Sequence, residues 1–254
     1  AGIRKIFVEK PSTDSPAKTR KILKRYPDAL VQVDYVERGH PVVLAIKDEM
    51  LKTGFKPKKF FHWRAHDVRA MVGKRVIHED LKRMTIRDLV HDISEMDFLL
   101  KATTGVNLEK DSPEVIMSRM KSWQEKYGQQ YPWQADVETD FTLRFSNGVE
   151  ARIRGNADFD YRRYFVIYND ETAFFGNTLE RKHLNITPVA AKIEGKENVK
   201  KLVRAAESGK LVTNEDFERS FTETNAIILD LSPHNPNALH VMIENLHTAK
   251  TKSD

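Results

Sequence analysis

One apolar run in the second half of the chain sets the strongest limit on the fold. Residues 164–168 read Tyr-Phe-Val-Ile-Tyr, with no polar residue at alternate positions. A strand that faces water on one side alternates apolar and polar residues, so this run predicts a central strand buried on both faces. Residues 227–231 have a similar character and predict another buried strand. Because both faces need cover, we expect a mixed α/β fold, with a central mixed β-sheet flanked by helices.

Residues 141–154 predict a β-hairpin. Apolar residues alternate along both halves, at Phe141, Leu143 and Phe145 and then at Val149, Ala151 and Ile153. A three-residue loop over 146–148, with Gly148 in the left-handed region, pairs Phe145 with Val149 and keeps one face apolar. The same register places opposite charges in two cross-strand pairs, Arg144 with Glu150 and Asp140 with Arg154.

The remaining pattern divides the chain into three sections, which could also form one continuous domain. Residues 1–83 predict an α/β section, in which a strand over 3–8, a helix from Pro16 and a strand over 29–36 come first. Residues 42–46 predict a third strand.

Residues 84–135 predict a helical section. One helix begins at Thr85, and a second begins at Ser112 and Pro113 with its buried side at Val115, Ile116, Met120, Trp123 and Tyr127. Residues 136–254 form a sheet-containing section, with helices expected over 199–206, from Asn214, and after residues 235–236.

Composition and net charge exclude several kinds of site and favour one kind of partner. The 254 residues carry a net charge of +5 and contain no cysteine, which excludes disulfides, thiolate metal sites and cysteine nucleophiles. No run of 18 apolar residues occurs, so the sequence predicts a soluble, cytoplasmic protein. The positive charge favours a polyanionic partner such as DNA or RNA. The sequence contains no dinucleotide-binding or phosphate-binding glycine motif.

A group of acidic residues surrounds the predicted central strand. In order along the chain come Glu138, the strand 141–145, Gly155-Asn156-Ala157-Asp158, the strand 165–168 and Asn169-Asp170-Glu171-Thr172. This order resembles the core of the RecB-type PD-(D/E)xK nucleases, in which a Gly-x-x-Asp turn precedes a strand ending in Asp-x-Lys-Thr. The resemblance implies metal-dependent phosphodiester hydrolysis, with Asp158 and Asp170 holding Mg²⁺, Glu138 as an outer metal ligand, and Glu171 holding or orienting water.

The catalytic lysine of that family is missing. Glu171 occupies its position in one register, and Thr172 occupies it when the register shifts by one residue. Either Arg152, Arg154 or Lys192 replaces the lysine, or the protein binds without cutting. We therefore expect a nucleic-acid-binding protein with a degenerate nuclease-like core. The alternative is a non-enzymatic architectural, regulatory or viral assembly protein associated with nucleic acid.

Residues 55–63 interleave cations with aromatic side chains, and two interpretations remain open. Lys56, Lys58 and Lys59 could contact phosphates together with Arg152 and Arg154, while the aromatic rings stack on bases. In the second interpretation, the aromatic side chains enter the core and the lysines stay in water.

Histidines provide two further alternatives. His183 and His240 faintly resemble the paired histidines of two-histidine phosphoesterases, which implies an acid–base pair that needs no metal. A metal site could instead form from histidines with nearby acids, namely His62, His66, His78 and His91 with Asp67, Glu79, Asp80 and Asp92.

Overall fold

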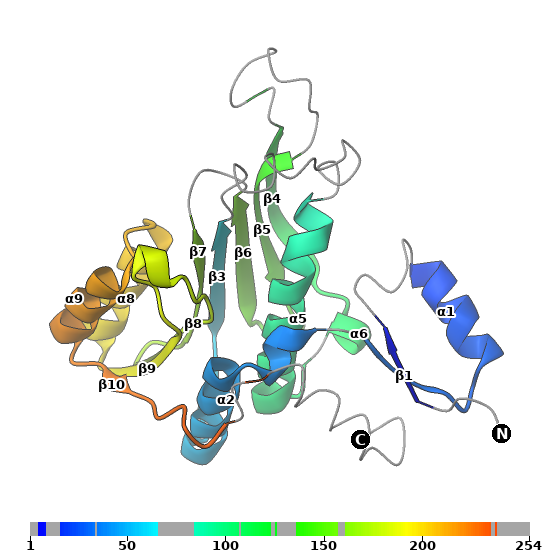
Figure 1. Cartoon of the computed structure of the whole chain (residues 1–254), viewed down its shortest axis with the longest axis horizontal. Coiled ribbons are helices and arrows are strands. Elements are labelled where there is room, and N and C mark those ends of the chain that lie inside the picture. The colour runs from blue at the N-terminus through cyan, green and yellow to red at the C-terminus, as the bar shows by residue number, and fades with distance from the viewer. Residues whose placement is uncertain are drawn as a thin grey trace.

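The structure is a computed structural model of the chain. It describes residues 5–8, 16–33, 35–65, 84–106, 108–122, 125, 136–156, 161–234 and 237. Within these residues, Figure 1 shows a central sheet with helices packed beside it and a smaller strand–helix–strand unit at one side. The expected mixed α/β fold with a central mixed sheet is confirmed.

Eight strands form the central sheet, in the order β10-β9-β8-β7-β3-β6-β5-β4. Only β3 and β6 are parallel neighbours, and the other neighbouring pairs are antiparallel. The strands are β3 (Lys59–Ala65), β4 (Glu114–Ser122), β5 (Asp136–Arg144), β6 (Glu150–Asn156), β7 (Arg162–Tyr168), β8 (Thr172–Asn177), β9 (Val189–Glu194) and β10 (Ile227–Ile228). This sheet therefore joins segments from all three sections of the sequence.

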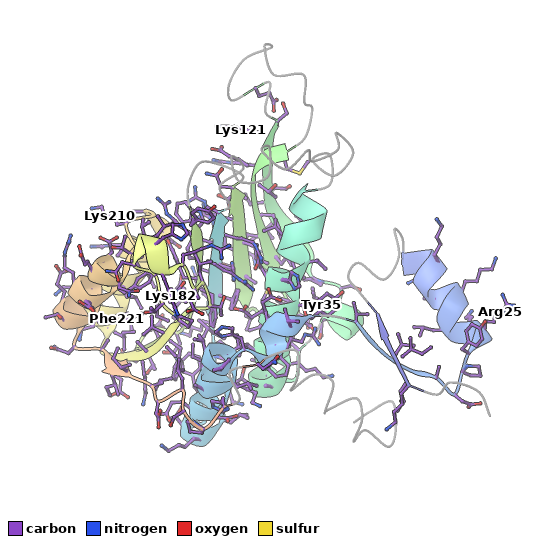
Figure 2. The ribbon with its side chains drawn as sticks, viewed as in Figure 1. Arg25, Tyr35, Lys121, Lys182, Lys210 and Phe221 are labelled. Atoms are coloured by element: carbon purple, nitrogen blue, oxygen red, sulfur yellow. The ribbon has the colours of Figure 1, made fainter. Side chains whose placement is uncertain are left out.

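Helices cover both faces of the sheet. On one face, α2 (Pro41–Thr53) contacts β8 and β9, and α5 (Met84–Thr104) contacts β3, β5 and β6. On the other face, α8 (Lys196–Glu207) and α9 (Asn214–Thr224) pack on β9, and Phe221 of α9 is labelled there in Figure 2. Strand β7 lies between the two layers, and its Tyr164–Ile167 stretch is fully buried. The prediction of a central, doubly buried strand is confirmed.

The predicted hairpin is also confirmed. The amide of Phe145 donates to the carbonyl of Val149 at 2.9 Å, and Gly148 has a φ of 83°. Arg144 pairs with Glu150 at 2.9 Å across the two strands. Asp140 lies opposite Arg154, as predicted, and forms its closest ion pair, at 2.7 Å, with the diagonal neighbour Arg152.

The first strand–helix–strand unit lies apart from the central sheet in Figure 1. Strands β1 (Lys5–Val8) and β2 (Leu30–Val33) pair in parallel, and α1 (Pro16–Arg25) connects them. These three elements confirm the predicted beginning of the chain. The short helix η1 (Val36–Gly39) then leads into α2.

Three predicted elements differ in the structure. Residues 42–46 belong to helix α2, because His40 caps its N-terminus, Pro41 occupies the first turn and Gly54 ends it in the left-handed conformation. The apolar residues of α2 also follow helical spacing, and Val42, Ile46 and Met50 are buried.

The second predicted helix of the middle section is instead strand β4, preceded by the short helix α6 (Leu108–Asp111). Pairing with β5 extends this edge of the sheet, and it leaves Val115 and Met120 exposed by 59% and 57%. Strand β10 has two residues and forms the opposite edge, so Ile227 and Ile228 are exposed rather than buried. A strand at the edge of a sheet can carry apolar residues that stay exposed. A local sequence pattern does not show whether a strand lies at the edge or in the centre.

Two sequence predictions fall on other parts of the chain. Trp123, Tyr127 and the helix expected after residues 235–236 lie outside the described residues. In the part of the chain that the structure describes, no helix is both long and apolar enough to cross a membrane.

Candidate functional site

A cluster of charged and polar side chains is buried between α5 and the sheet. Alternate residues of β3 point toward α5, so His62 and Arg64 follow the core residue Phe60 on the same face. Arg163 of β7 is the direct register partner of Arg64 on β3. The cluster consists of Glu37 from η1, His62 and Arg64 from β3, His91, Asp92 and Glu95 from α5, and Arg163 from β7.

Arg64 and Arg163 bring two positive charges into this buried cluster, and each of them has a carboxylate partner. Arg64 Nη1 donates to Asp92 Oδ1 at 2.6 Å, and the Asp92 side chain has no exposed surface. Burial alone would raise the pKa of Asp92, but the charges of Arg64, His62 and Arg163 and the hydrogen bond from Arg64 together lower it. Asp92 is therefore ionised and balances one of the two arginines.

Glu37 balances the second arginine and also contacts His91. Glu37 Oε1 accepts a short hydrogen bond from Arg163 Nη2, and Glu37 Oε2 lies in close contact with His91 Nδ1. Burial would raise the pKa of Glu37, but the hydrogen bond with His91 and the charge of Arg163 hold it well below its usual range. Arg163, Glu37 and His91 thus form a chain of three linked polar groups.

Contacts of Arg38 and Tyr35 hold the short helix η1, which carries Glu37, against α5. Arg38 Nε donates to the carbonyl of Ser94 at 3.1 Å, and Arg38 Nη2 pairs with Asp97 Oδ2 at 3.3 Å. Tyr35, labelled beside this junction in Figure 2, meets the His91 ring edge to face. These contacts hold η1 against the part of α5 that contains His91.

His62 and Glu95 occupy the deepest part of the cluster. His62 Nε2 lies 3.4 Å from Asp92 Oδ1 and 3.9 Å from Glu95 Oε1, and its ring stacks near Phe60 and Phe165. Burial lowers the pKa of His62 to about 4, so its ring is neutral near pH 7. Burial also raises the pKa of Glu95 well above its usual range. Burial therefore favours the neutral form of both side chains in this deepest pair.

This arrangement sets imidazoles beside carboxylates, a combination that can exchange protons. Among the residues that the structure describes, no group of three or more histidines, aspartates and glutamates has the geometry of a metal site. His91 is an imidazole with an ionised carboxylate on one ring nitrogen, which is a common arrangement for a general acid or base.

The sequence pointed to part of this cluster and missed the rest. His62, His91 and Asp92 were candidate metal ligands, and the structure brings them together. The other candidates, His66, Asp67, His78, Glu79 and Asp80, lie outside the described residues. Glu37, Arg64 and Arg163 were missed. The available signal was local: two polar residues interrupt the apolar strand β3, and a His-Asp pair lies on a helix with an apolar face.

The acidic residues predicted for the nuclease-like site do not form one group. Glu138 is opposite Asn156 at one end of β6, whereas Asp170 follows Tyr168, which lies level with Glu150 at the other end. At about 3.3 Å per residue, the length of β6 separates them by roughly 20 Å, while bonds to Mg²⁺ span about 2.1 Å. Glu138 pairs instead with Lys121, labelled at the top of the sheet in Figure 2.

The other predicted catalytic residues have ordinary surroundings or are not described. Asp170 is exposed in the turn after β7 and forms a short ion pair with Lys58. Glu171 is exposed in the same turn, where its amide donates to Asn169 Oδ1 at 3.0 Å. Asp158 lies outside the described residues. Asn169 therefore organises a turn at this end of the sheet.

The predicted nucleic-acid contacts also have partners within the protein. Lys56 Nζ donates to the carbonyl of Thr103 at 2.9 Å, and Lys59 pairs with Glu150 at 3.7 Å. Arg152 pairs with Asp140, and the Arg154 guanidinium lies 4.0 Å from the centre of the Trp63 ring.

The aromatic side chains of the same segment enter the core. Phe55, Phe60, Phe61 and Trp63 are all buried. The interpretation in which the lysines stay in water while the rings pack inside is therefore confirmed. No stacking platform for bases forms from these rings.

The histidines of the phosphoesterase alternative are not brought together among the described residues. His183 is exposed on the short helix η2 (Lys182–Leu184), and His240 lies outside the described residues.

Comparison with known proteins identifies relatives by fold alone. No protein-family model matches the sequence, and no curated protein matches it. Solved structures do match. A putative NADPH-dependent oxidoreductase from Desulfitobacterium hafniense has a TM-score of 0.62 at 14% identity, over 94% of this chain and 61% of the other.

Two further matches are also oxidoreductases. The 3-ketoreductase KijD10 from Actinomadura kijaniata, in complex with NADP and TDP-benzene, has a TM-score of 0.53 at 14% identity, over 84% of this chain and 65% of that one. An oxidoreductase from Pseudomonas syringae has a TM-score of 0.52 at 12% identity, over 92% of this chain and 52% of that one. The chain thus spans less than two thirds of the length of these three proteins.

These matches correct the functional predictions made from the sequence. The shared fold is that of NADP-dependent oxidoreductases, so the nuclease-like core was wrong, and with it the expectation of a nucleic-acid-binding hydrolase. Magnesium as cofactor and DNA or RNA as partner were wrong for the same reason, and the non-enzymatic nucleic-acid-associated alternative has no support. The physical cause is that short acidic turns occur in many folds, and only their distance in space makes a metal site.

Proposed function

We propose that this chain forms the substrate-side α/β domain of a nicotinamide-dependent oxidoreductase that acts on a carbonyl or hydroxyl group, with His91 as its general acid or base. Reduction of a carbonyl needs a hydride at carbon and a proton at oxygen, and His91 is suited to the proton. The observation that carries the proposal is the buried Arg163–Glu37–His91 chain, in a fold that is shared with NADP-dependent enzymes.

The residues of this chain do not fit a whole nicotinamide dinucleotide. Dinucleotide-binding folds hold the pyrophosphate at a helix N-terminus that follows a Gly-x-Gly-x-x-Gly turn. The 254 residues contain no such motif, and residues 9–15, between β1 and α1, contain no glycine. We therefore assign proton transfer to this chain, and we do not assign it the binding of the pyrophosphate.

The proton chemistry follows from the surroundings of His91. The contact with Glu37 is made by Nδ1, so that carboxylate does not occupy the second ring nitrogen, Nε2. The ring is almost fully buried, which limits competition from water. Nε2 can therefore accept the proton of a substrate hydroxyl in one direction and return it to a carbonyl oxygen in the other.

The proposal is tested by following NADPH oxidation by the full-length protein with a panel of small ketones and nucleotide-linked ketones. His91→Asn should lower the rate by about 10²–10⁴-fold, the usual contribution of a general acid or base. The matched control is His183→Asn, which changes an exposed histidine on η2 and should leave the rate unchanged. NADPH oxidation that survives His91→Asn, or no NADPH binding and turnover at all, would overturn the proposal.

A further inference from the structure

The carboxylate of Glu37 bridges two groups that come from distant parts of the chain. One oxygen accepts from Arg163 on β7, and the other contacts Nδ1 of His91 on α5. Glu37 itself belongs to η1, which Arg38 fastens to α5. Three separate elements thus meet at one buried carboxylate.

The protonation state of Glu37 decides which nitrogen of His91 carries a hydrogen. Burial would raise the pKa of Glu37, but the contact with His91 and the charges of Arg163, His91 and Arg64 together keep it well below its usual range. An ionised carboxylate can only accept hydrogen bonds. The close contact between Glu37 Oε2 and His91 Nδ1 therefore favours the tautomer that carries its hydrogen on Nδ1.

Among the described residues, the other two carboxyl groups of the cluster have other neighbours than His91. Asp92 Oδ1 accepts a hydrogen bond from Arg64 Nη1 at 2.6 Å. Glu95 lies beside His62 rather than His91. Among the described residues, Arg64, Arg163 and His91 favour the ionised form of Glu37. His40 and His62 have pKa values lowered to about 4 by burial, so both are neutral near pH 7.

We propose that Glu37 is a positioning residue, which Arg163 holds in place and which fixes His91 in the tautomer that carries its hydrogen on Nδ1. Nε2 then carries the lone pair that can accept a proton, and the imidazolium formed when Nε2 takes a proton stays beside the negative charge of Glu37. The catalytic consequence rests on the proposed function, whereas the tautomer is a property of the protein without any ligand.

The tautomer can be measured by ¹⁵N NMR of the full chain with labelled histidine, at a pH where His91 is neutral. The native protein should contain His91 mainly as the Nδ1–H tautomer. In Glu37→Gln the ratio of Nδ1–H to Nε2–H should fall by about tenfold, because the amide loses the charge and can present either its oxygen or its NH₂ group. The control is Glu95→Gln, which changes an uncharged group of the same cluster and should leave the ratio unchanged.

A purely structural role for Glu37 would change stability without changing this ratio. A native protein with mainly the Nε2–H tautomer overturns the proposal, and this measurement needs no variant to fold. An unchanged ratio in Glu37→Gln, together with turnover that depends on His91, would remove the positioning role and keep the proposed function. Mainly Nδ1–H in a protein without NADPH-dependent turnover would keep the positioning role and remove the proposed function.

Discussion

At the scale of single residues, the buried cluster keeps two carboxyl groups of α5 in different states. Asp92 and Glu95 lie three residues apart, and neither side chain is exposed. Asp92 has Arg64 as its partner, whereas neither oxygen of Glu95 has a hydrogen-bond partner among the described residues. An ionised carboxylate without partners is costly inside a protein, so burial favours the protonated form of Glu95 in the folded state.

We expect Asp92→Asn to reduce the stability of the protein and Glu95→Gln to be tolerated. Asp92→Asn removes the carboxylate charge that Arg64 contacts at 2.6 Å and should reduce the free energy of unfolding by about 3–5 kcal/mol. Glu95→Gln replaces one uncharged group by another of similar shape, and it should be tolerated. Urea denaturation of both variants at neutral pH measures the difference.

The pH dependence of Glu95→Gln has a definite sign. The pKa of Glu95 is raised by burial in the folded state, so its stabilising contribution is complete below the unfolded pKa of 4.5 and is lost as pH rises toward the folded pKa. Glutamine does not titrate. The variant should therefore gain stability relative to the native protein as pH rises above 4.5, and a pH-independent difference would contradict a raised pKa of Glu95.

At the scale of elements, the β5–β6 hairpin depends on one backbone conformation. Gly148 has a φ of 83°, and a Cβ placed there would meet no atom within 4 Å. Any cost of substitution therefore comes from the backbone and not from a clash. The loop also uses Asn147, whose side-chain oxygen accepts from the amide of Val149 at 3.1 Å.

Gly148→Ala should lower the free energy of unfolding by about 1–2 kcal/mol, the cost of a left-handed conformation for an L-residue. Gly148→Asn is the matched variant, since asparagine adopts this conformation more readily, and it should cost clearly less. Chemical denaturation of the two variants makes the comparison. Equal stability of the alanine variant and the native protein would contradict the left-handed loop.

At the scale of the whole molecule, the central sheet and the β1–α1–β2 unit differ in how many neighbouring elements pack against them. The central sheet has eight strands and helices on both faces. In the described part of the chain, β1 and β2 pair only with each other, and Leu23 and Tyr26 beside them are exposed. Two short parallel strands have little independent stability in water.

Hydrogen–deuterium exchange of the 254-residue chain should therefore show two levels of protection. We expect amides of β1 and β2 to exchange on the order of 100-fold faster than those of β3 and β7, because local opening of the smaller unit does not require global unfolding. Mass spectrometry of peptides from the two regions measures this ratio. Equal protection would mean that the small unit and the central sheet unfold as one.

The local pattern of the sequence determined those elements whose residues interact with near neighbours. The β5–β6 register follows from alternation and one glycine, and the burial of residues 164–167 follows from an uninterrupted apolar run. Helix α5 follows from apolar spacing of three and four residues. Strand β4 and the edge position of β10 did not follow, because a short apolar segment does not specify which strand it will pair with.

Only the tertiary structure decided which polar residues act together. Glu138 and Asp170 are close in the sequence, but the sheet places them at opposite ends. Glu37, His91 and Arg163 are distant in the sequence, yet they meet because η1, α5 and β7 pack at one place. The pairing of buried charges depends on distance in space and on exclusion of water, and neither quantity is contained in a local pattern of residues.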